Sequence, residues 1–238
     1  MWSWTAFASF LTSPQILEGA WTTIWLTVVS MVLGLVLGCV VALMRTARFP
    51  AVRAVAGFYV WLFRGTPLLV QLVIIFTGLP QLGIRFGVIT SALLGLVLNE
   101  AAYLSEIVRA GVSSVPRGQV EAARALGMPP AKVAGVVVLP QAFRIMLPPL
   151  GNSFNSLLKT TTLVSVVSVE ELLRRTQLAV QIDFRVLEGL VAAAVLYLVM
   201  TTLWGFVQRW LESISERGHT QSVRRRPAST PIEKVGSA

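Results

Sequence analysis

Long apolar stretches separated by short polar connections dominate this chain. Four of them run over about 20–44, 57–79, 88–108 and 186–207, and a more polar one over about 145–169. A helix needs about 20 apolar residues to cross a hydrocarbon core of about 30 Å. Inside a bilayer no water satisfies the backbone, so helices are the expected form of such stretches. The pattern predicts an all-α, polytopic membrane protein with about five transmembrane helices.

The second stretch is interrupted at residues 64–67, which read Arg-Gly-Thr-Pro. Proline lacks a backbone donor and disfavours helical geometry in the preceding residue, so we expect the helix to break there. Two alternatives are open. Either residues 55–63 lie along the membrane interface, or a kinked helix crosses with Arg64 in a protein-lined cavity or snorkelling to the surface.

The first stretch carries Gly34 and Gly38, four residues apart. Small residues at this spacing allow a second helix to approach closely. Alternatively, the two glycines have no packing role, because membrane helices tolerate glycine. The spacing alone does not decide between close packing and simple tolerance.

Polar side chains interrupt the third stretch. Asn99, Tyr103 and Glu106 are spaced to share one helix face, and Glu100 lies beside them. Ionisable groups within a span are costly and usually face a bundle interior or a water-filled cavity. Either this stripe lines a pathway, or Glu106 is wetted near the helix end or pairs with Arg109. The more polar stretch contains Lys159, Thr160 and Thr161, so we expect it to be buried or to line a cavity.

Residues 118–140 form an elbow between two apolar stretches. Good helix formers at 120–126 end at Gly127, and Pro129-Pro130 follows, which predicts a short helix, a sharp turn and a second helix start. We expect Gly127 at positive φ and Glu121 near a helix start. Small residues on one face suit a groove on a soluble partner: Ala122, Ala123, Ala125 and Gly127. The alternative is an interfacial helix that only connects two spans.

Charge placement orients the chain. Fourteen of the 20 Lys and Arg residues fall on one side, in the connection after the first stretch, in the elbow region and in the C-terminal segment. The positive-inside rule therefore places the N-terminus outside and the elbow and C-terminus in the cytoplasm. The expected division is an extracytoplasmic segment 1–19, a transmembrane domain 20–211 with a cytoplasmic loop at about 113–145, and a disordered basic tail 212–238.

Composition narrows the class of protein. With 55% hydrophobic and 13% charged residues, the 238-residue chain is too apolar for an ordinary soluble domain. The net charge of +9 fits membrane orientation better than a nucleic-acid partner. Cys39 and His219 are the only residues of their kinds, so we expect no catalytic residues and no metal site, and a membrane-embedded enzyme is disfavoured. The sequence has no G-x-x-x-x-G-K-[ST] loop to hold ATP phosphates.

The elbow resembles the EAA loop of permease subunits in bacterial ABC importers. Glu121-Ala122-Ala123 is followed by Gly127, by an aliphatic Val137 and by Leu139-Pro140. Val137 replaces the usual isoleucine, and Glu100 stands where a small or neutral residue is expected. The resemblance covers about 19–211, and six segments are similar to the polar amino-acid uptake branch: 63–69, 102–107, 116–119, 139–142, 148–152 and 158–161.

This resemblance implies the type I permease fold in the bacterial cytoplasmic (inner) membrane, and a transporter subunit rather than an enzyme. The elbow would be the coupling helix, with coupling residues Gly118, Glu121, Ala122, Ala123, Gly127, Leu139 and Pro140. Expected partners are two cytoplasmic ABC ATPase subunits, a second permease chain that is a copy or a relative, an extracytoplasmic amino-acid-binding protein and membrane lipid. The ATPases would bind ATP and Mg, while this chain would bind no cofactor.

The resemblance further implies that this chain forms half of the translocation pathway for an amino acid. Acidic groups in a cavity would suit the ammonium of an amino acid or a cationic side chain, or they would pair with Lys159. An ion-coupled secondary transporter or channel is the alternative, favoured only by the intramembrane charges, and no inverted repeat supports it. The expected pathway residues are Arg64, Asn99, Glu100, Tyr103, Glu106, Lys159, Thr160 and Thr161.

Overall fold

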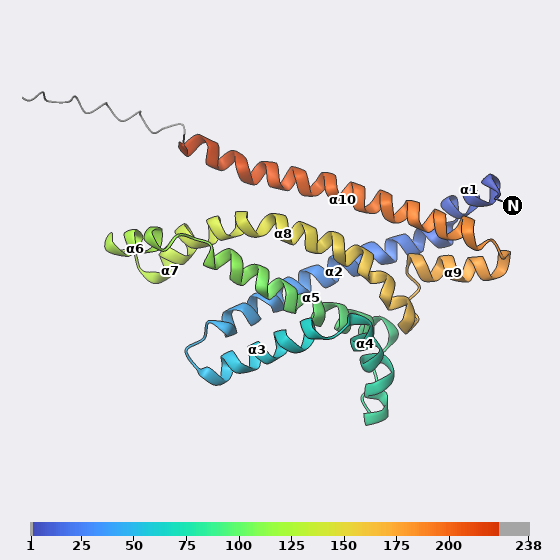
Figure 1. Ribbon diagram of the computed structural model, residues 1–238, viewed down its shortest axis with the longest axis horizontal. Coiled ribbons are helices and arrows are strands. Elements are labelled where there is room, and N and C mark those ends of the chain that lie inside the picture. The colour runs from blue at the N-terminus through green and yellow to red at the C-terminus, as the bar shows by residue number, and fades with distance from the viewer. Residues whose placement is uncertain (1, 224–238) are drawn as a thin grey trace, which may run out of the picture.

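The computed structural model describes residues 2–223, and all regular structure within that range is helical. Figure 1 shows long, roughly side-by-side helices, with α6 and α7 at one end of the bundle and α9 at the other. The α-helices are α1 (Trp4–Thr12), α2 (Pro14–Arg45), α3 (Pro50–Gly65), α4 (Leu68–Val73), α5 (Val88–Ser113), α6 (Arg117–Ala125), α7 (Pro130–Lys132), α8 (Leu139–Thr160), α9 (Leu172–Asp183) and α10 (Val186–Val223). Two π-helical segments, η1 (Ile74–Gly78) and η3 (Val133–Val138), and two 3-10 segments, η2 (Leu79–Leu82) and η4 (Thr161–Val167), join them.

Four segments are long and apolar enough to cross a membrane: α2, α5, Pro130–Val167 and Val186–Ser215. A fifth, formed by α3 together with Leu68–Leu82, qualifies as one span bent by 104°. The expectation of about five helices in a polytopic all-α protein is therefore confirmed. The expected break at residues 64–67 is the point of this bend, because α3 ends at Gly65 and α4 begins at Leu68.

Helix α3 packs beside α2 and α5. Its buried Ala56 and Val60 contact Val41 of α2, and the Tyr59 hydroxyl donates a 2.6 Å hydrogen bond to the Leu98 carbonyl of α5. These contacts favour the kinked-helix alternative over a segment that lies along the membrane interface.

Glycines bring α2 and α5 together. A Cβ at Gly34 would lie 3.3 Å from Cβ of Glu100, and one at Gly38 would lie 3.0 Å from the Ala101 carbonyl oxygen. Any larger residue would push α5 away from α2, so the close packing suggested by the glycine spacing is confirmed.

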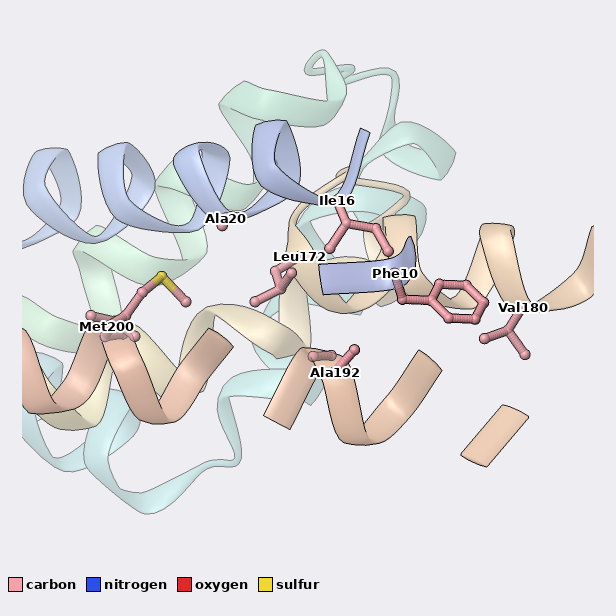
Figure 2. Packing of buried hydrophobic residues seen from close by; sticks show 9 residues of the cluster. Phe10, Ile16, Ala20, Leu172, Val180, Ala192 and Met200 are labelled. Atoms are coloured by element: carbon pink, nitrogen blue, oxygen red, sulfur yellow. The ribbon is translucent and has the colours of Figure 1, made fainter. Parts of the chain in front are cut away.

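The end of the bundle that charge placement assigns to the outside has its own core. Phe10, Ile16, Leu172, Val180 and Ala192 pack together there from α1, α2, α9 and α10 (Figure 2). Burial of this apolar surface fixes α9 against the start of α2 and the first turns of α10.

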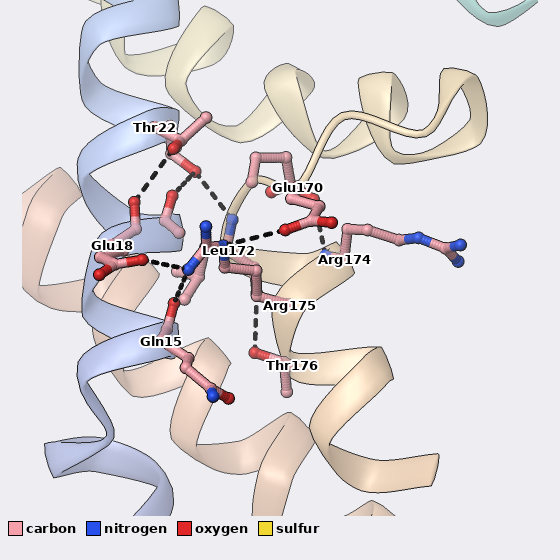
Figure 3. Close-up of polar contacts among 11 residues, drawn as sticks. Gln15, Glu18, Thr22, Glu170, Leu172, Arg174, Arg175 and Thr176 are labelled. Carbon is pink, nitrogen blue, oxygen red and sulfur yellow. Dashed lines mark hydrogen bonds and ion pairs between the residues drawn. The ribbon is translucent and has the colours of Figure 1, made fainter. Parts of the chain in front are cut away.

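Polar contacts reinforce that end. Arg175 of α9 donates to the Glu18 carboxylate at 2.5 Å and to the Gln15 carbonyl at 3.1 Å, both on the first turns of α2 (Figure 3). Beneath them lies Glu171, the fully buried N-cap residue of α9. We call this region, where α9 meets α2 and α10 around Glu171, the outer junction.

Element boundaries differ from the division suggested by composition. Helix α2, which contains the first candidate span, begins at Pro14, and α1 precedes it, so the expected segment 1–19 is largely helical. At the other end, α10 continues to Val223, past the boundary at 212. The remainder of the expected tail, residues 224–238, lies outside the described residues.

Candidate functional site

A cavity of about 520 Å³ opens where α3 breaks. Three elements line it: the break itself, the middle of α5 and the second half of α8. Five of the predicted pathway residues meet there, together with hydroxyl groups that the sequence analysis did not select. The polar side chains around it are Arg64, Thr66, Asn99, Glu100, Tyr103, Ser153, Ser156 and Thr160.

The break has a specific cause in the backbone. In a continuous helix the Phe63 carbonyl would accept from the N–H of residue 67, but Pro67 has none. Two side-chain amides replace that donor: Gln71 Nε2 lies 3.0 Å from the Phe63 oxygen and Asn99 Nδ2 lies 3.1 Å from it. Asn99 also donates to Gln71 Oε1 at 3.1 Å, so the break is tied to α5.

Glu100 is the buried carboxylate of this cavity. It is 8% exposed, and Ser153 Oγ of α8 donates to it at 2.5 Å. Lys159, the lysine suggested as its partner, is exposed and does not line the cavity. Within residues 2–215, whose side chains the structure describes, no ion pair involves Glu100.

Arg64 provides the positive charge of the cavity. Its guanidinium carbon lies 5.3 Å from the centre of the Tyr103 ring, a cation–π distance. Its Nη1 is 3.8 Å from Glu106 Oε1, too far for a hydrogen bond. The cavity therefore presents a carboxylate and a guanidinium together with several hydroxyl groups.

Glu106 lies outside this cavity and lines the neighbouring one. The sequence left open whether it pairs with Arg109, and the structure shows that pair at 2.7 Å. Arg45, at the end of α2, contacts the other carboxylate oxygen. Glu106 thus joins the cytoplasmic ends of α2 and α5 by charge.

Lys159 and Thr161 are likewise absent from the lining. Thr161 is fully buried, and its hydroxyl donates to the Leu158 carbonyl at 2.7 Å. From α8 the cavity is lined by the predicted Thr160 and by Ser153 and Ser156. Their spacing of three and four residues puts the three side chains on one face of the helix. That spacing is visible in the sequence and was the signal for the missed serines.

The elbow has the predicted form. Helix α6 ends at Ala125, Gly127 follows with φ of +77°, and α7 begins at Pro130. The positive φ expected for Gly127 is confirmed, and an L-residue would be strained there. Gln141 Nε2 donates to Gln119 Oε1 at 2.6 Å, which ties α6 to α8.

Two details of the elbow differ from expectation. Helix α6 begins at Arg117, so Glu121 lies mid-helix, and the expectation that it sits near a helix start is wrong. The alanines do not form one exposed face, because Ala123 is 5% exposed whereas Ala122 and Ala125 are exposed. Of the other predicted coupling residues, Gly118, Leu139 and Pro140 are exposed. Val115, Ala142 and Met146 form an apolar cluster where the elbow joins α5 and α8.

Metal or cofactor ligands do not gather in the part of the chain that the structure describes. No group of three or more His, Cys, Asp or Glu side chains comes close enough there to hold a metal ion.

Comparison with known proteins defines the class. The chain belongs to the family of binding-protein-dependent transport system inner membrane components, which matches residues 31–214. It is the multi-pass membrane permease of an ATP-driven importer and not itself an ATPase.

Two individual relatives have names that state what they transport. The chain is 38% identical to the arginine transport system permease protein ArgU of Corynebacterium glutamicum, over 99% of this chain and 79% of the relative. It is 40% identical to the arginine transport system permease protein ArtQ of Bacillus subtilis strain 168, over 84% and 91% of the two chains.

Solved structures agree with this family. A crystal structure of an amino acid ABC transporter with histidines matches with a TM-score of 0.84 and 34% identity, over 90% of this chain and 99% of that one. The MetNI methionine ABC transporter, in inward-facing conformations, matches with a TM-score of 0.71 at 21% identity, which supports the fold alone. The prediction of an ABC importer permease is confirmed.

Proposed function

We propose that the cavity at the α3 break carries an amino acid with a cationic side chain through the membrane, and that Glu100 binds that side-chain cation. One observation carries the proposal: Glu100 is a buried carboxylate that lines the cavity and has no cationic partner among the described residues. A buried carboxylate is costly unless it is paired, and a ligand cation would supply the pair.

The size of the cavity and the charge of Arg64 suit the remaining parts of an amino acid, including its carboxylate. A volume of about 520 Å³ is within the range of roughly 300–1,000 Å³ that small-molecule sites occupy. The Arg64 guanidinium matches a carboxylate in charge and in fork geometry. The names of two relatives, both arginine transport permeases, are consistent with a cationic substrate.

The elbow is the proposed contact with one of the two cytoplasmic ABC ATPase subunits of the assembly, and these ATPases would bind ATP and Mg. Glu121 and Ala122 are exposed on α6, and the α6–α8 hydrogen bond and the apolar cluster beneath would transmit its motion. A second permease chain, a copy or a relative, would provide the other half of the pathway. An extracytoplasmic binding protein would deliver the amino acid.

The test compares Glu100→Gln with Lys159→Gln in the purified permease–ATPase complex. Binding of labelled arginine and of labelled glutamine is measured with each. Because glutamine at position 100 keeps the shape and removes the charge, we expect arginine affinity to fall by roughly tenfold or more, the effect of losing about 1.4 kcal/mol. Glutamine binding should change little.

Lys159→Gln is the matched control, because this exposed lysine does not line the cavity. It should leave both affinities unchanged. Equal arginine binding by wild type and Glu100→Gln would refute the proposed role of Glu100.

A further inference from the structure

A second cavity, of about 460 Å³, adjoins the first and shares Arg64 with it. Its other polar lining residues are Glu106, Arg109 and Ser114. Ser114 caps the end of α5, immediately before the elbow. The second cavity therefore lies on the cytoplasmic side of the first.

Few polar contacts hold the Arg64 side chain in its position between the two cavities. No hydrogen bond from its guanidinium occurs among the side chains described, those of residues 2–215, and its only ion pair there is the 3.8 Å contact with Glu106. Both oxygens of Glu106 already have closer partners: Arg45 on one, and Nε and Nη2 of Arg109, at 3.0 and 2.7 Å, on the other. The donors of Arg64 are thus free to bind a carboxylate.

The side chain of Arg64 has room to move. It is 43% exposed, and a Cβ at the neighbouring Gly65 would meet no atom within 4 Å. A change of its rotamer, with the break still held by the amides of Gln71 and Asn99, would carry the guanidinium from one cavity toward the other.

The walls of the second cavity connect it to the elbow. They come from α5, through Ala110 and Gly111, and from α8, through Ile145 and Pro149. These two helices are the ones that the elbow joins, so displacement of the elbow would change the width of this cavity. Arg64 and Arg109 outnumber Glu106 in the lining, which favours an anionic group.

We propose that Arg64 is a movable barrier between a membrane-embedded substrate cavity and a cytoplasmic exit cavity. It binds the carboxylate of the amino acid in the first cavity, and its movement toward Glu106 opens the passage into the second. The proposal rests on the proposed function in one respect, that the first cavity holds the substrate.

The barrier is tested by thiol accessibility, which requires no substrate. In a Cys39→Ser background, single Ser156→Cys and Ala110→Cys variants report on the first and second cavities. Inside-out vesicles with the assembled transporter, without ATP, are treated with a membrane-impermeant, uncharged, sugar-linked methanethiosulfonate, so that charge repulsion by Arg64 does not set the rate. We expect Ala110→Cys to react quickly whatever residue is at position 64. Ser156→Cys should react slowly with Arg64 and roughly tenfold faster with Arg64→Ala.

Arg64→Lys controls for folding and should keep Ser156→Cys slow, because lysine retains length and charge. Assembly of each variant with the ATPase is checked by size-exclusion chromatography. Equal reaction rates of Ser156→Cys with Arg64 and with Arg64→Ala would overturn the barrier.

Carboxylate binding is tested separately with arginine and its decarboxylated analogue agmatine, on the permease–ATPase complex. We expect wild type to prefer arginine, and Arg64→Gln to reduce that preference by roughly tenfold. An unchanged preference would overturn the carboxylate role. If Glu100→Gln leaves arginine binding intact, the proposed function fails, while the thiol reaction still decides whether Arg64 is a barrier.

Discussion

Two buried glutamates of this protein have opposite surroundings. At the outer junction, Glu171 is fully buried and accepts hydrogen bonds from the Leu173 and Arg174 backbone amides, at 2.9 and 2.8 Å, and from the Tyr197 hydroxyl at 2.7 Å. Glu100, which is 8% exposed and lines the cavity, accepts one hydrogen bond among the described residues, from Ser153.

The difference sets a carboxylate whose hydrogen bonds the protein supplies apart from the one that we propose binds the substrate. Burial is tolerated where the protein itself supplies the hydrogen bonds, and such a group ties its neighbours together. Glu171 joins α9 to α10 in this way, whereas Glu100, under the proposed function, would bind a cation that enters the cavity. Burial alone does not distinguish the two; the number of protein partners does.

The largest expected effect is on folding, from Glu171→Ala. The change leaves Tyr197 and two backbone amides without their acceptor, and each buried unsatisfied group costs about 1–3 kcal/mol. We expect a marked fall in the melting temperature of the detergent-solubilised protein, followed by fluorescence-detected size exclusion. Glu170→Ala, at the exposed neighbour, should change it little. A Glu171→Ala protein as stable as wild type would mean that the outer junction is not held by this carboxylate.

The second largest effect is expected from Gly127→Val at the exposed elbow, and it concerns the coupling of ATP hydrolysis to transport. A β-branched residue at φ of +77° is strained by about 1–3 kcal/mol, so the turn between α6 and α7 should shift. We expect ATPase stimulation by loaded binding protein, and uptake, to fall together while the melting temperature stays near wild type. Gly57→Val is the matched control, since Gly57 is helical and a Cβ there meets no atom within 4 Å. Normal coupling in correctly inserted Gly127→Val would make the elbow a simple connector.

The smallest effect is expected from Ser153→Ala, which removes the single hydrogen bond to Glu100. A hydrogen bond to a charged group contributes about 1.5–3 kcal/mol, but water in the cavity can replace the lost donor. We therefore expect a few-fold change in arginine binding by the permease–ATPase complex and little change in stability. A destabilisation as large as that of Glu171→Ala would place Glu100 with the structural carboxylates and remove the contrast between them.

Much of the architecture follows from local sequence. The apolar stretches, the break at Pro67 and the positive φ of Gly127 each depend on a few adjacent residues, and the structure has all three. Helix α6 begins earlier than expected, at Arg117, because the N-cap residue is Pro116, whose ψ of 128° is not helical, and the helix starts directly after it. Glu121 is displaced from the first turn for that reason.

The composition of the site was less predictable, because it depends on which face of a helix points inward. On α8, Lys159 and Thr160 are adjacent in sequence, yet only Thr160 reaches the cavity. Ser153 and Ser156 share that face and look ordinary in isolation. Glu171 was missed because its Tyr197 partner is on another helix, 26 residues away.

The cavity forms at the point where the helix breaks, because Pro67 has no backbone N–H. Pro67 cannot donate to the Phe63 carbonyl, and the amides of Gln71 and Asn99 donate to it instead, from two different helices. Pro67 and the two amides are therefore interdependent. Replacing the proline alone would restore the backbone donor and let the helix continue, and removing both amides would leave the Phe63 carbonyl without a donor.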